Sequence, residues 1–242
     1  MKKLWIFCLI IFGIPAPVFA QQKVPILIYH SIDEYNGHGI KELYVTPENF
    51  EKQMTYLKDH GYTLLTFERW QDMNKVNKPI FITFDDGYKN NLNAFSIFQK
   101  LKTAHFQPTG TIFVISDFIN RSNRLAESDI KMLVNSGIFS IQSHTATHPD
   151  LTKIEDYQYE LKGSKEKIEK ISGKPVIALA YPYGNFNDRV VKETMKYYRF
   201  GITTTPELFS EHGIKNELFY IPRIYVKYST TLKDFAKAVK GE

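Results

Sequence analysis

Cysteine is almost absent from this chain of 242 residues, and the only one is Cys8. A single cysteine cannot form a disulfide within the chain, and a zinc site built from several thiolates is equally excluded. The fold must therefore be held by a hydrophobic core, and any metal ion must be bound by histidine and carboxylate side chains.

The chain also lacks a dense block of basic residues. Lysine and arginine exceed aspartate and glutamate by 31 to 26, and the lysines are scattered over the predicted helices. Proteins that bind nucleic acid concentrate their basic residues on one face or in one segment. We therefore expect no nucleic-acid partner, and the surface is either ordinary and solvated or weakly attracted to an anionic cell wall.

Long apolar runs are confined to the first twenty residues, MKKLWIFCLIIFGIPAPVFA. Two lysines, an apolar stretch and the small residues Val18 and Ala20 predict a secretory signal peptide over residues 1–20. The stretch is too short to favour a permanent membrane span. Without it the net formal charge falls from +5 to about +3. We expect one exported domain over residues 21–242, secreted, extracellular or associated with the cell wall.

Short apolar runs rich in Val, Ile, Phe and Thr alternate along the chain with longer segments of helical periodicity. The runs predicted as strands are 24–29, 62–66, 79–84, 109–115, 137–143, 176–181, 200–205 and 220–226.

Helix signals lie between these strands. One helix is expected between an N-cap at Thr46 and a stop at Gly61, and others over 154–175 and 187–198. No internal repeat or linker divides the chain, so the alternation predicts one α/β domain of parallel strands, as a barrel or as an open sheet. In either fold the chemistry collects at the carboxyl ends of the strands.

The stretch FITFDDGYKN places Asp85 and Asp86 directly after a predicted strand. Asp-Gly is a common turn pair, so a turn without chemistry is one interpretation. Two adjacent carboxylates repel each other at a buried strand end, and a bound cation would remove that conflict. One aspartate could then bind the metal while its neighbour accepts a proton.

The stretch SIQSHTATHPD places His144 just after another predicted strand and His148 four residues later. Such a pair can bind one metal ion, although pairs at this spacing are also frequent by chance. Pro149 disfavours a regular helix across both histidines and favours a shaped loop. Together with Asp86 they would leave coordination positions open for water and substrate, as catalytic sites do.

A third predicted strand ends in YPYG, with Pro182, Tyr183 and Gly184. The simple interpretation is a rigid turn between a strand and a helix. The functional alternative is that this turn aims the backbone N–H of Tyr183 into a site, where it helps to hold a developing oxyanion. Pro182 and Tyr183 are therefore candidate substrate-binding residues, and Tyr183 is also a candidate catalytic residue.

The segments TFDDG, SHTATH and YPYG, in this order, resemble the motifs of the polysaccharide deacetylase family (carbohydrate esterase family 4, with the NodB-homology domain). The resemblance spans essentially all of residues 21–242. It implies a distorted (β/α) barrel of about seven parallel strands that removes N-acetyl groups from a glycan with one divalent metal ion. It also implies that Asp85 is the general base and that Asp86, His144 and His148 bind the metal. We expect zinc, although cobalt and nickel suit the same ligands.

Two positions depart from the family pattern. The third motif usually begins with an arginine two residues before the proline, and here that residue is Ala180. The segment YIPRIYVKYS near the C-terminus also lacks the usual catalytic histidine. Arg223 in this segment is a candidate replacement for the arginine.

The segment LIYH, which ends at His30, resembles the missing last motif moved to the front of the chain. A closed barrel tolerates this order because its first and last strands are neighbours. The branch of the family that deacetylates poly-N-acetylglucosamine, a biofilm exopolysaccharide, shows the same permuted order and also lacks the arginine. The resemblance therefore implies that His30 is the general acid, and a polar residue capping a strand end is the alternative.

From these observations we expect a secreted de-N-acetylase of a glycan, with poly-N-acetylglucosamine as its substrate. Peptidoglycan, chitin oligomers and acetylated xylan are alternative substrates. A protein of another class, a catalytically weak relative that only binds glycans, is the remaining alternative.

Overall fold

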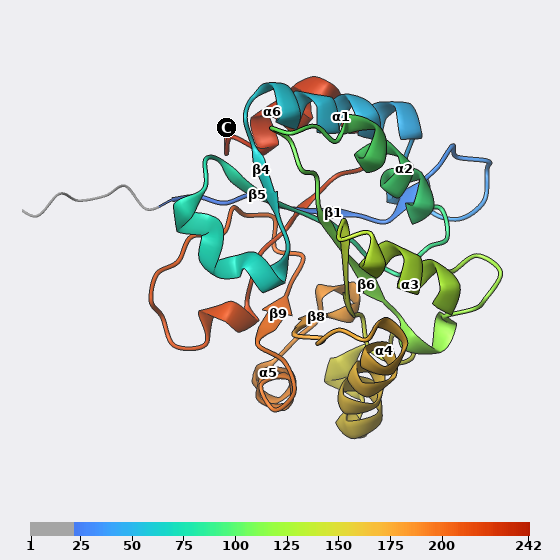
Figure 1. Cartoon of the computed structure of the whole chain (residues 1–242). Helices are drawn as coiled ribbons and strands as arrows, with labels where there is room; N and C mark the ends of the chain where they lie inside the picture. Colours follow the sequence, from blue (N-terminus) through green and yellow to red (C-terminus); the bar gives the residue numbers. More distant parts are fainter. Residues whose placement is uncertain (1–21) are drawn as a thin grey trace, which may run out of the picture.

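The computed structural model describes residues 22–242, and the predicted signal peptide lies outside this range. A parallel sheet forms its centre, with seven strands in the order β10-β1-β5-β6-β7-β8-β9 (Figure 1). These strands are β1 (Ile26–Tyr29), β5 (Pro79–Phe84), β6 (Gly110–Val114), β7 (Phe139–Ser143), β8 (Ala178–Ala180), β9 (Phe200–Ile202) and β10 (Ile224–Tyr225).

Three further strands are short. The strand β4 (Thr63–Leu65) pairs with the first half of β5, on the edge where β6 pairs with the second half. The strands β2 (Ser31–Ile32) and β3 (Tyr44–Val45) form a separate pair just after β1.

The two ends of the seven-strand path approach each other. Ile202 of β9 forms a parallel bridge with Ile221, and three residues later β10 pairs with β1. This segment joins the last strand to the first, so the curled sheet is the expected distorted barrel. This change of partner also explains why the predicted strand 220–226 is mostly irregular. Its first part pairs with β9 and its last part pairs with β1.

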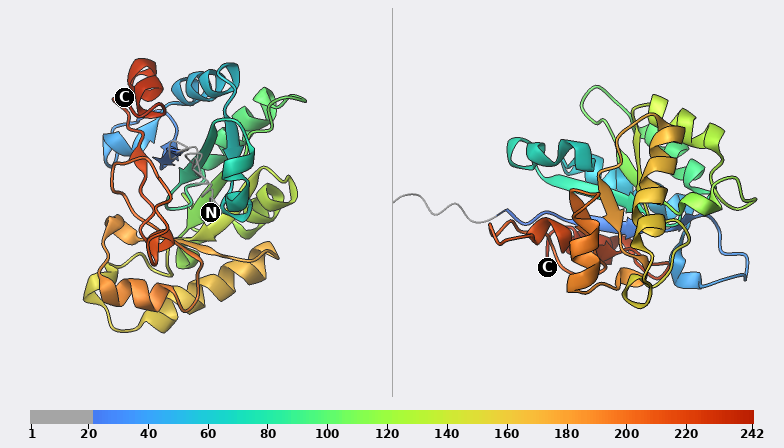
Figure 2. Two further views of the ribbon diagram at one scale, coloured as in Figure 1. Left: turned by 90° about the vertical axis from the view of Figure 1, so that its left-hand side faces the viewer. Right: turned by 90° about the horizontal axis from the view of Figure 1, so that it is seen from below.

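Within residues 22–242 there are six α-helices, and they cover the outside of the curved sheet (Figures 1 and 2). The helix α1 contacts both α2 and α6, and α3 packs against α4. Their bounds are α1 (Pro47–Asp59), α2 (Asn91–Leu101), α3 (Glu127–Asn135), α4 (Ser164–Ser172), α5 (Asp188–Thr194) and α6 (Leu232–Ala238). Within residues 22–242 no helix combines the length and the apolar character that crossing a membrane requires.

The helix ends follow the local sequence signals. Thr46 accepts a hydrogen bond from the N–H of Asn49 at 3.2 Å, and Gly173 ends α4 with a φ of 68°. The expected helix over 154–175 is different in its first half, where a π-helix (Gln158–Gly163) precedes α4. A π-helix is rare and is wider than an α-helix.

Side-chain alternation along the strands divides the core into two parts. In β5, Ile80, Ile82 and Phe84 face the helices, whereas Phe81 faces the barrel interior with Trp70. The same alternation turns Thr83 and Asp85 toward the interior. The amino-terminal half of the barrel is therefore filled with aromatic rings, and its carboxyl-terminal half is polar.

Candidate active site

The residues singled out in the sequence lie at the carboxyl ends of four parallel strands. The sheet ladder extends to two of them, because the N–H of Asp85 donates to the carbonyl of Tyr29 and the N–H of His144 donates to that of Val114, both at 2.9 Å. His30 follows β1, and Asp85 and Asp86 follow β5. His144 and His148 come after β7, and Pro182 and Tyr183 come after β8.

Asp86, His144 and His148 each present one ligand atom, and the three atoms lie within 4.8 Å of one another. The Nε2 atoms of the two histidines are 3.1 Å apart, and Asp86 Oδ1 is 3.6 Å from one and 3.7 Å from the other. The Nδ1–H of His144 donates to the carbonyl of Ala180 at 2.8 Å, which leaves its Nε2 unprotonated in the neutral ring. Two imidazole nitrogens and one carboxylate oxygen at this spacing fit a divalent metal ion such as zinc.

His148 is in the protonation state that a metal ligand needs. Burial, together with the neighbouring His144, lowers the pKa of His148 to about 4. Its imidazole is therefore neutral at physiological pH.

The site is built on strained backbone. Seven non-glycine residues within 22–242 have a positive φ, and four of them belong to this site: Asp86, Thr145, His148 and Tyr183. Such a conformation costs about 1–3 kcal/mol per residue and persists only where the surroundings enforce it. The concentration of this strain at one place favours a functional site.

Asp85 and Arg223 form a buried ion pair inside the barrel. The Arg223 guanidinium donates to both carboxylate oxygens, at 2.7 and 2.8 Å, to the hydroxyl of Thr83 at 3.1 Å and to the carbonyl of Thr203 at 2.9 Å. Arg223 is fully buried. Ala180, the position of the family's usual arginine, also faces the interior.

The charges around Asp85 keep it ionised. Burial by itself raises the pKa of the Asp85 carboxyl, but the guanidinium of Arg223, with smaller effects of His144 and His30, outweighs burial and holds that pKa well below its usual range. Asp85 Oδ2 is also 3.8 Å from His144 Nε2, so the predicted base lies next to the predicted metal ligands.

His30 lies beside these carboxylates. Its carbonyl accepts a hydrogen bond from Asn91 at 2.6 Å, and its ring lies 5.3 Å from the ring of Tyr225. Burial lowers the pKa of His30, and the charges of Asp85 and Asp86 partly oppose this. Its Nδ1 is buried and has no hydrogen-bond partner within the described residues.

The YPYG turn brings Tyr183 to the surface of the site. Its ring lies 4.6 Å from the ring of His148. Tyr183 as a residue is 65% exposed, whereas Pro182 is buried. Of these two candidate substrate-binding residues, only Tyr183 presents its side chain to solvent.

Sequence reasoning missed Glu160 and the contacts of Asn91 and Tyr225 with His30. Glu160 is 7% exposed and hydrogen-bonds to the loop between the two histidines. The available signal was a glutamate on the apolar face of its helix, between Tyr157 and Leu161. The side-chain amide of Asn91 carries no such signal, because asparagine is common at the start of a helix.

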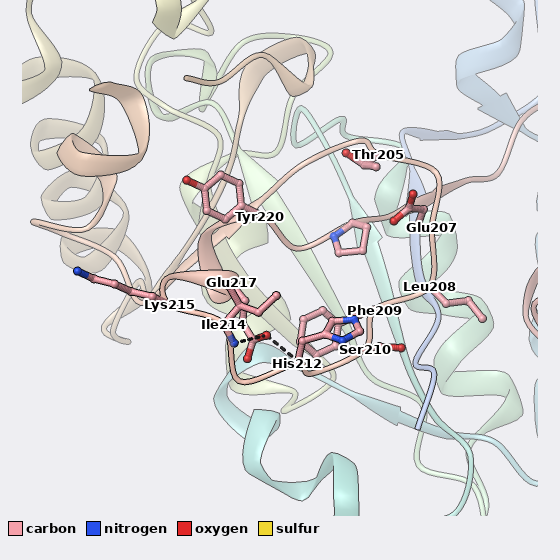
Figure 3. Close-up of a pocket in the computed structure, with 11 residues that line it drawn as sticks. Thr205, Glu207, Leu208, Phe209, Ser210, His212, Ile214, Lys215, Glu217 and Tyr220 are labelled. Atoms are coloured by element: carbon pink, nitrogen blue, oxygen red, sulfur yellow. Dashed lines mark hydrogen bonds between the residues drawn. The ribbon is translucent and has the colours of Figure 1, made fainter. Parts of the chain in front are cut away.

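A cavity of about 290 Å³ lies within the long loop between β9 and β10 (Figure 3). Glu217 on its wall accepts hydrogen bonds from the backbone of His212 and Ile214, at 2.8 and 3.3 Å, so this carboxylate shapes the loop. No predicted site residue lines this cavity, and it is not part of the site.

Replacing one metal-binding histidine should abolish metal binding, whereas replacing His30 should not. We expect His148→Ala to lose zinc or cobalt binding in equilibrium dialysis, because two ligands remain, and His30→Ala to keep it. Equal loss of metal in both variants would place His30 among the ligands and contradict its assignment as the acid.

Removing Arg223 should destabilise the fold as well as the site. Arg223→Met leaves Asp85 buried without its partner, which should lower the free energy of unfolding by about 3–5 kcal/mol in urea titrations. The exposed Arg199→Met is the matched control and should change it by less than about 0.5 kcal/mol. Because the pKa of Asp85 is lowered in the folded state, the ion pair stabilises the protein at neutral pH, and this contribution should fade below the unfolded pKa of 3.8. An Arg223→Met variant as stable as the control would show that the pair does not form.

Comparison with known proteins supports the same family. A family model described as polysaccharide deacetylase matches residues 72–200. YxkH of Bacillus subtilis, a protein named for this family, is 34% identical over an alignment of 193 positions that covers 76% of this chain and 65% of YxkH. The poly-beta-1,6-N-acetyl-D-glucosamine N-deacetylase of Staphylococcus epidermidis is 28% identical over an alignment of 220 positions that covers 81% of this chain and 73% of that protein.

A solved structure is similar to this chain over most of its length. A polysaccharide deacetylase from Bacillus cereus is 58% identical and superimposes with a TM-score of 0.89, over 90% of this chain and 69% of that one. The present chain thus spans roughly two thirds of the length of YxkH and of the B. cereus protein. With a family model over more than half of its residues and these relatives over most of them, the chain belongs to the polysaccharide deacetylase family.

Proposed function

We propose that this protein is a metal-dependent de-N-acetylase that removes acetyl groups from the N-acetylglucosamine units of a poly-N-acetylglucosamine exopolysaccharide. The observation that carries the reaction is the convergence of a metal-ligand set with a carboxylate base and a histidine at one end of the barrel. The substrate rests on the position of His30 at the first strand and on the similarity to the S. epidermidis enzyme.

Asp86, His144 and His148 would hold the metal ion. When bound, such an ion polarises a carbonyl and lowers the pKa of water. Asp85 then accepts a proton from the attacking water. The ion pair with Arg223 makes Asp85 a weak base, which would suffice for a water whose pKa a bound metal ion lowers, and general-base assistance is typically worth about 10²–10⁴-fold.

Two groups act on the amide after the attack. The backbone N–H of Tyr183 donates a hydrogen bond to the developing oxyanion. His30, in its protonated form, donates a proton to the departing nitrogen. The products are acetate and a glucosamine unit with a free amine.

We also propose that the protein is exported and acts outside the cell or in the cell wall. This rests on the signal-peptide pattern of residues 1–20. Fractionation that found the protein only inside cells would reject it.

Acetate release tests the reaction and its substrate. The metal-free protein, reloaded with zinc or cobalt, should release acetate from oligomers of β-1,6-linked N-acetylglucosamine faster than from chitin oligomers or peptidoglycan. Asp85→Asn should lower the rate at least about 10²-fold, because it removes the base. A preference for peptidoglycan would replace the proposed substrate, and no release from any glycan despite tight metal binding would favour a relative that only binds glycans.

The rate should also depend on pH through His30. Its acid form is lost as pH rises, and because burial lowers the pKa of His30 below 6.5, the fall in kcat/KM should begin at a lower pH than a free imidazole would give. Together with an ascending limb at acid pH this predicts a bell-shaped profile. His30→Ala should lower the rate and remove the descending limb. A wild-type rate that only increases with pH is incompatible with His30 as the acid.

A further inference from the structure

We propose that Glu160 is the residue that positions the metal-binding loop 144–148, and this inference rests on the metal site of the proposed function. One oxygen of its carboxylate accepts hydrogen bonds from the backbone N–H groups of Ala146 and Thr147, both at 2.9 Å. The other oxygen accepts from the Thr147 hydroxyl at 2.6 Å. Glu160 is thus a buried carboxylate whose three hydrogen bonds all go to the segment between the two histidines.

The loop needs such a partner because of its shape. Thr145 and His148 both adopt left-handed backbone conformations, with φ of 67° and 65°. These turns bring the two imidazoles together, and within the described residues neither the N–H of Ala146 nor that of Thr147 donates to a backbone carbonyl. Buried backbone N–H groups without a partner cost free energy comparable to a lost hydrogen bond. Glu160 supplies the missing acceptors and so stabilises the conformation in which both histidines face one point.

The helix that carries Glu160 holds the loop at a second place. Ser164, four residues later, is hydrogen-bonded to the hydroxyl of Ser143 at 2.9 Å, and that hydroxyl accepts the N–H of Thr145 at 3.2 Å. Glu160 lies in the π-helix Gln158–Gly163, and Ser164 is the first residue of α4. Since α4 packs against β7, the helix fixes the loop relative to the strand from which His144 emerges. Single π-helical turns of this kind occur frequently at functional sites.

Hydrogen bonding and charge can be separated by substitution. Glutamine keeps one acceptor oxygen for the two backbone N–H groups, and the Thr147 hydroxyl can rotate to accept from the new amide. Alanine removes all three contacts. If Glu160 acts by positioning, glutamine should preserve the site and alanine should not.

Metal titration of the metal-free protein tests this directly. With Co²⁺ or Zn²⁺ as the probe, Glu160→Ala should raise the dissociation constant about 10–100-fold, the usual effect of losing a group that orients metal ligands. Glu160→Gln should stay within about threefold of the wild type, with an unchanged Co²⁺ absorption spectrum. Glu169→Ala is the matched control: its carboxylate, on α4 just after this π-helix, binds Lys165 and the N–H of Val176 at 2.7 and 2.9 Å, away from the loop. This variant should lower Tm and leave metal affinity unchanged.

Three results would overturn the proposal. Glu160→Ala could lower Tm like the control and still bind the metal as tightly as the wild type, which would make Glu160 merely structural. Glu160→Gln could bind as weakly as Glu160→Ala, which would assign the effect to charge. If Glu160→Ala does not fold, Glu160→Asp replaces it: the shorter side chain keeps the charge but cannot reach both N–H groups in the same way, so positioning predicts weaker metal binding and wild-type affinity refutes it.

The test also separates this inference from the proposed function. A wild-type protein that binds metal but releases no acetate contradicts the proposed reaction and leaves the comparison of variants intact. A wild-type protein that binds no metal contradicts the metal site itself. In that case, amide hydrogen exchange at Ala146 and Thr147 decides: it should be faster in Glu160→Ala than in Glu160→Gln, and equal rates refute the contacts.

Discussion

The ion pair between Arg223 and Asp85 is the interaction on which the rest of this site depends. Arg223 lies just before β10, and Asp85 follows β5. These two strands flank β1, so the ion pair links the neighbours of β1 through the barrel interior. A buried carboxylate is costly without a partner, and this one has a bidentate guanidinium. The same contact therefore closes the barrel, keeps Asp85 ionised and fixes its position beside His144.

The small residues of β8 make room for this arrangement. Ala178 and Ala180 face the interior, and the backbone carbonyl of Ala180 accepts the Nδ1–H of His144. β8 therefore contributes to the site through its backbone, because this carbonyl orients the His144 ring.

The site combines strained backbone with rigid supports. Four residues in left-handed conformations turn the chain so that side chains from separate strands meet, at a cost of about 1–3 kcal/mol each. Buried polar contacts from Arg223 and Glu160 offset that cost, because each satisfies several groups at once. A metal ion held by Asp86, His144 and His148 would add to this support.

The sequence by itself determined the local features of this protein. Apolar runs and caps such as Thr46 and Gly173 placed most strands and helix ends, and the order of the short motifs indicated Asp85, Asp86, His144 and His148 as one group. These features depend on neighbouring residues, so they can be read from a short window of sequence. His30 was accessible only through resemblance, because a histidine after a strand has no local signature.

Only the tertiary structure decided which distant groups support the site. Arg223 and Asp85 are 138 residues apart in the sequence, and Asn91 and His30 are 61 apart. Of the predicted strand 220–226, only Ile224 and Tyr225 form β10, because the neighbouring strand changes from β9 to β1 along this segment. Such contacts arise from the closure of the barrel and from the packing of α2 beside β2, and no periodicity within either segment encodes them.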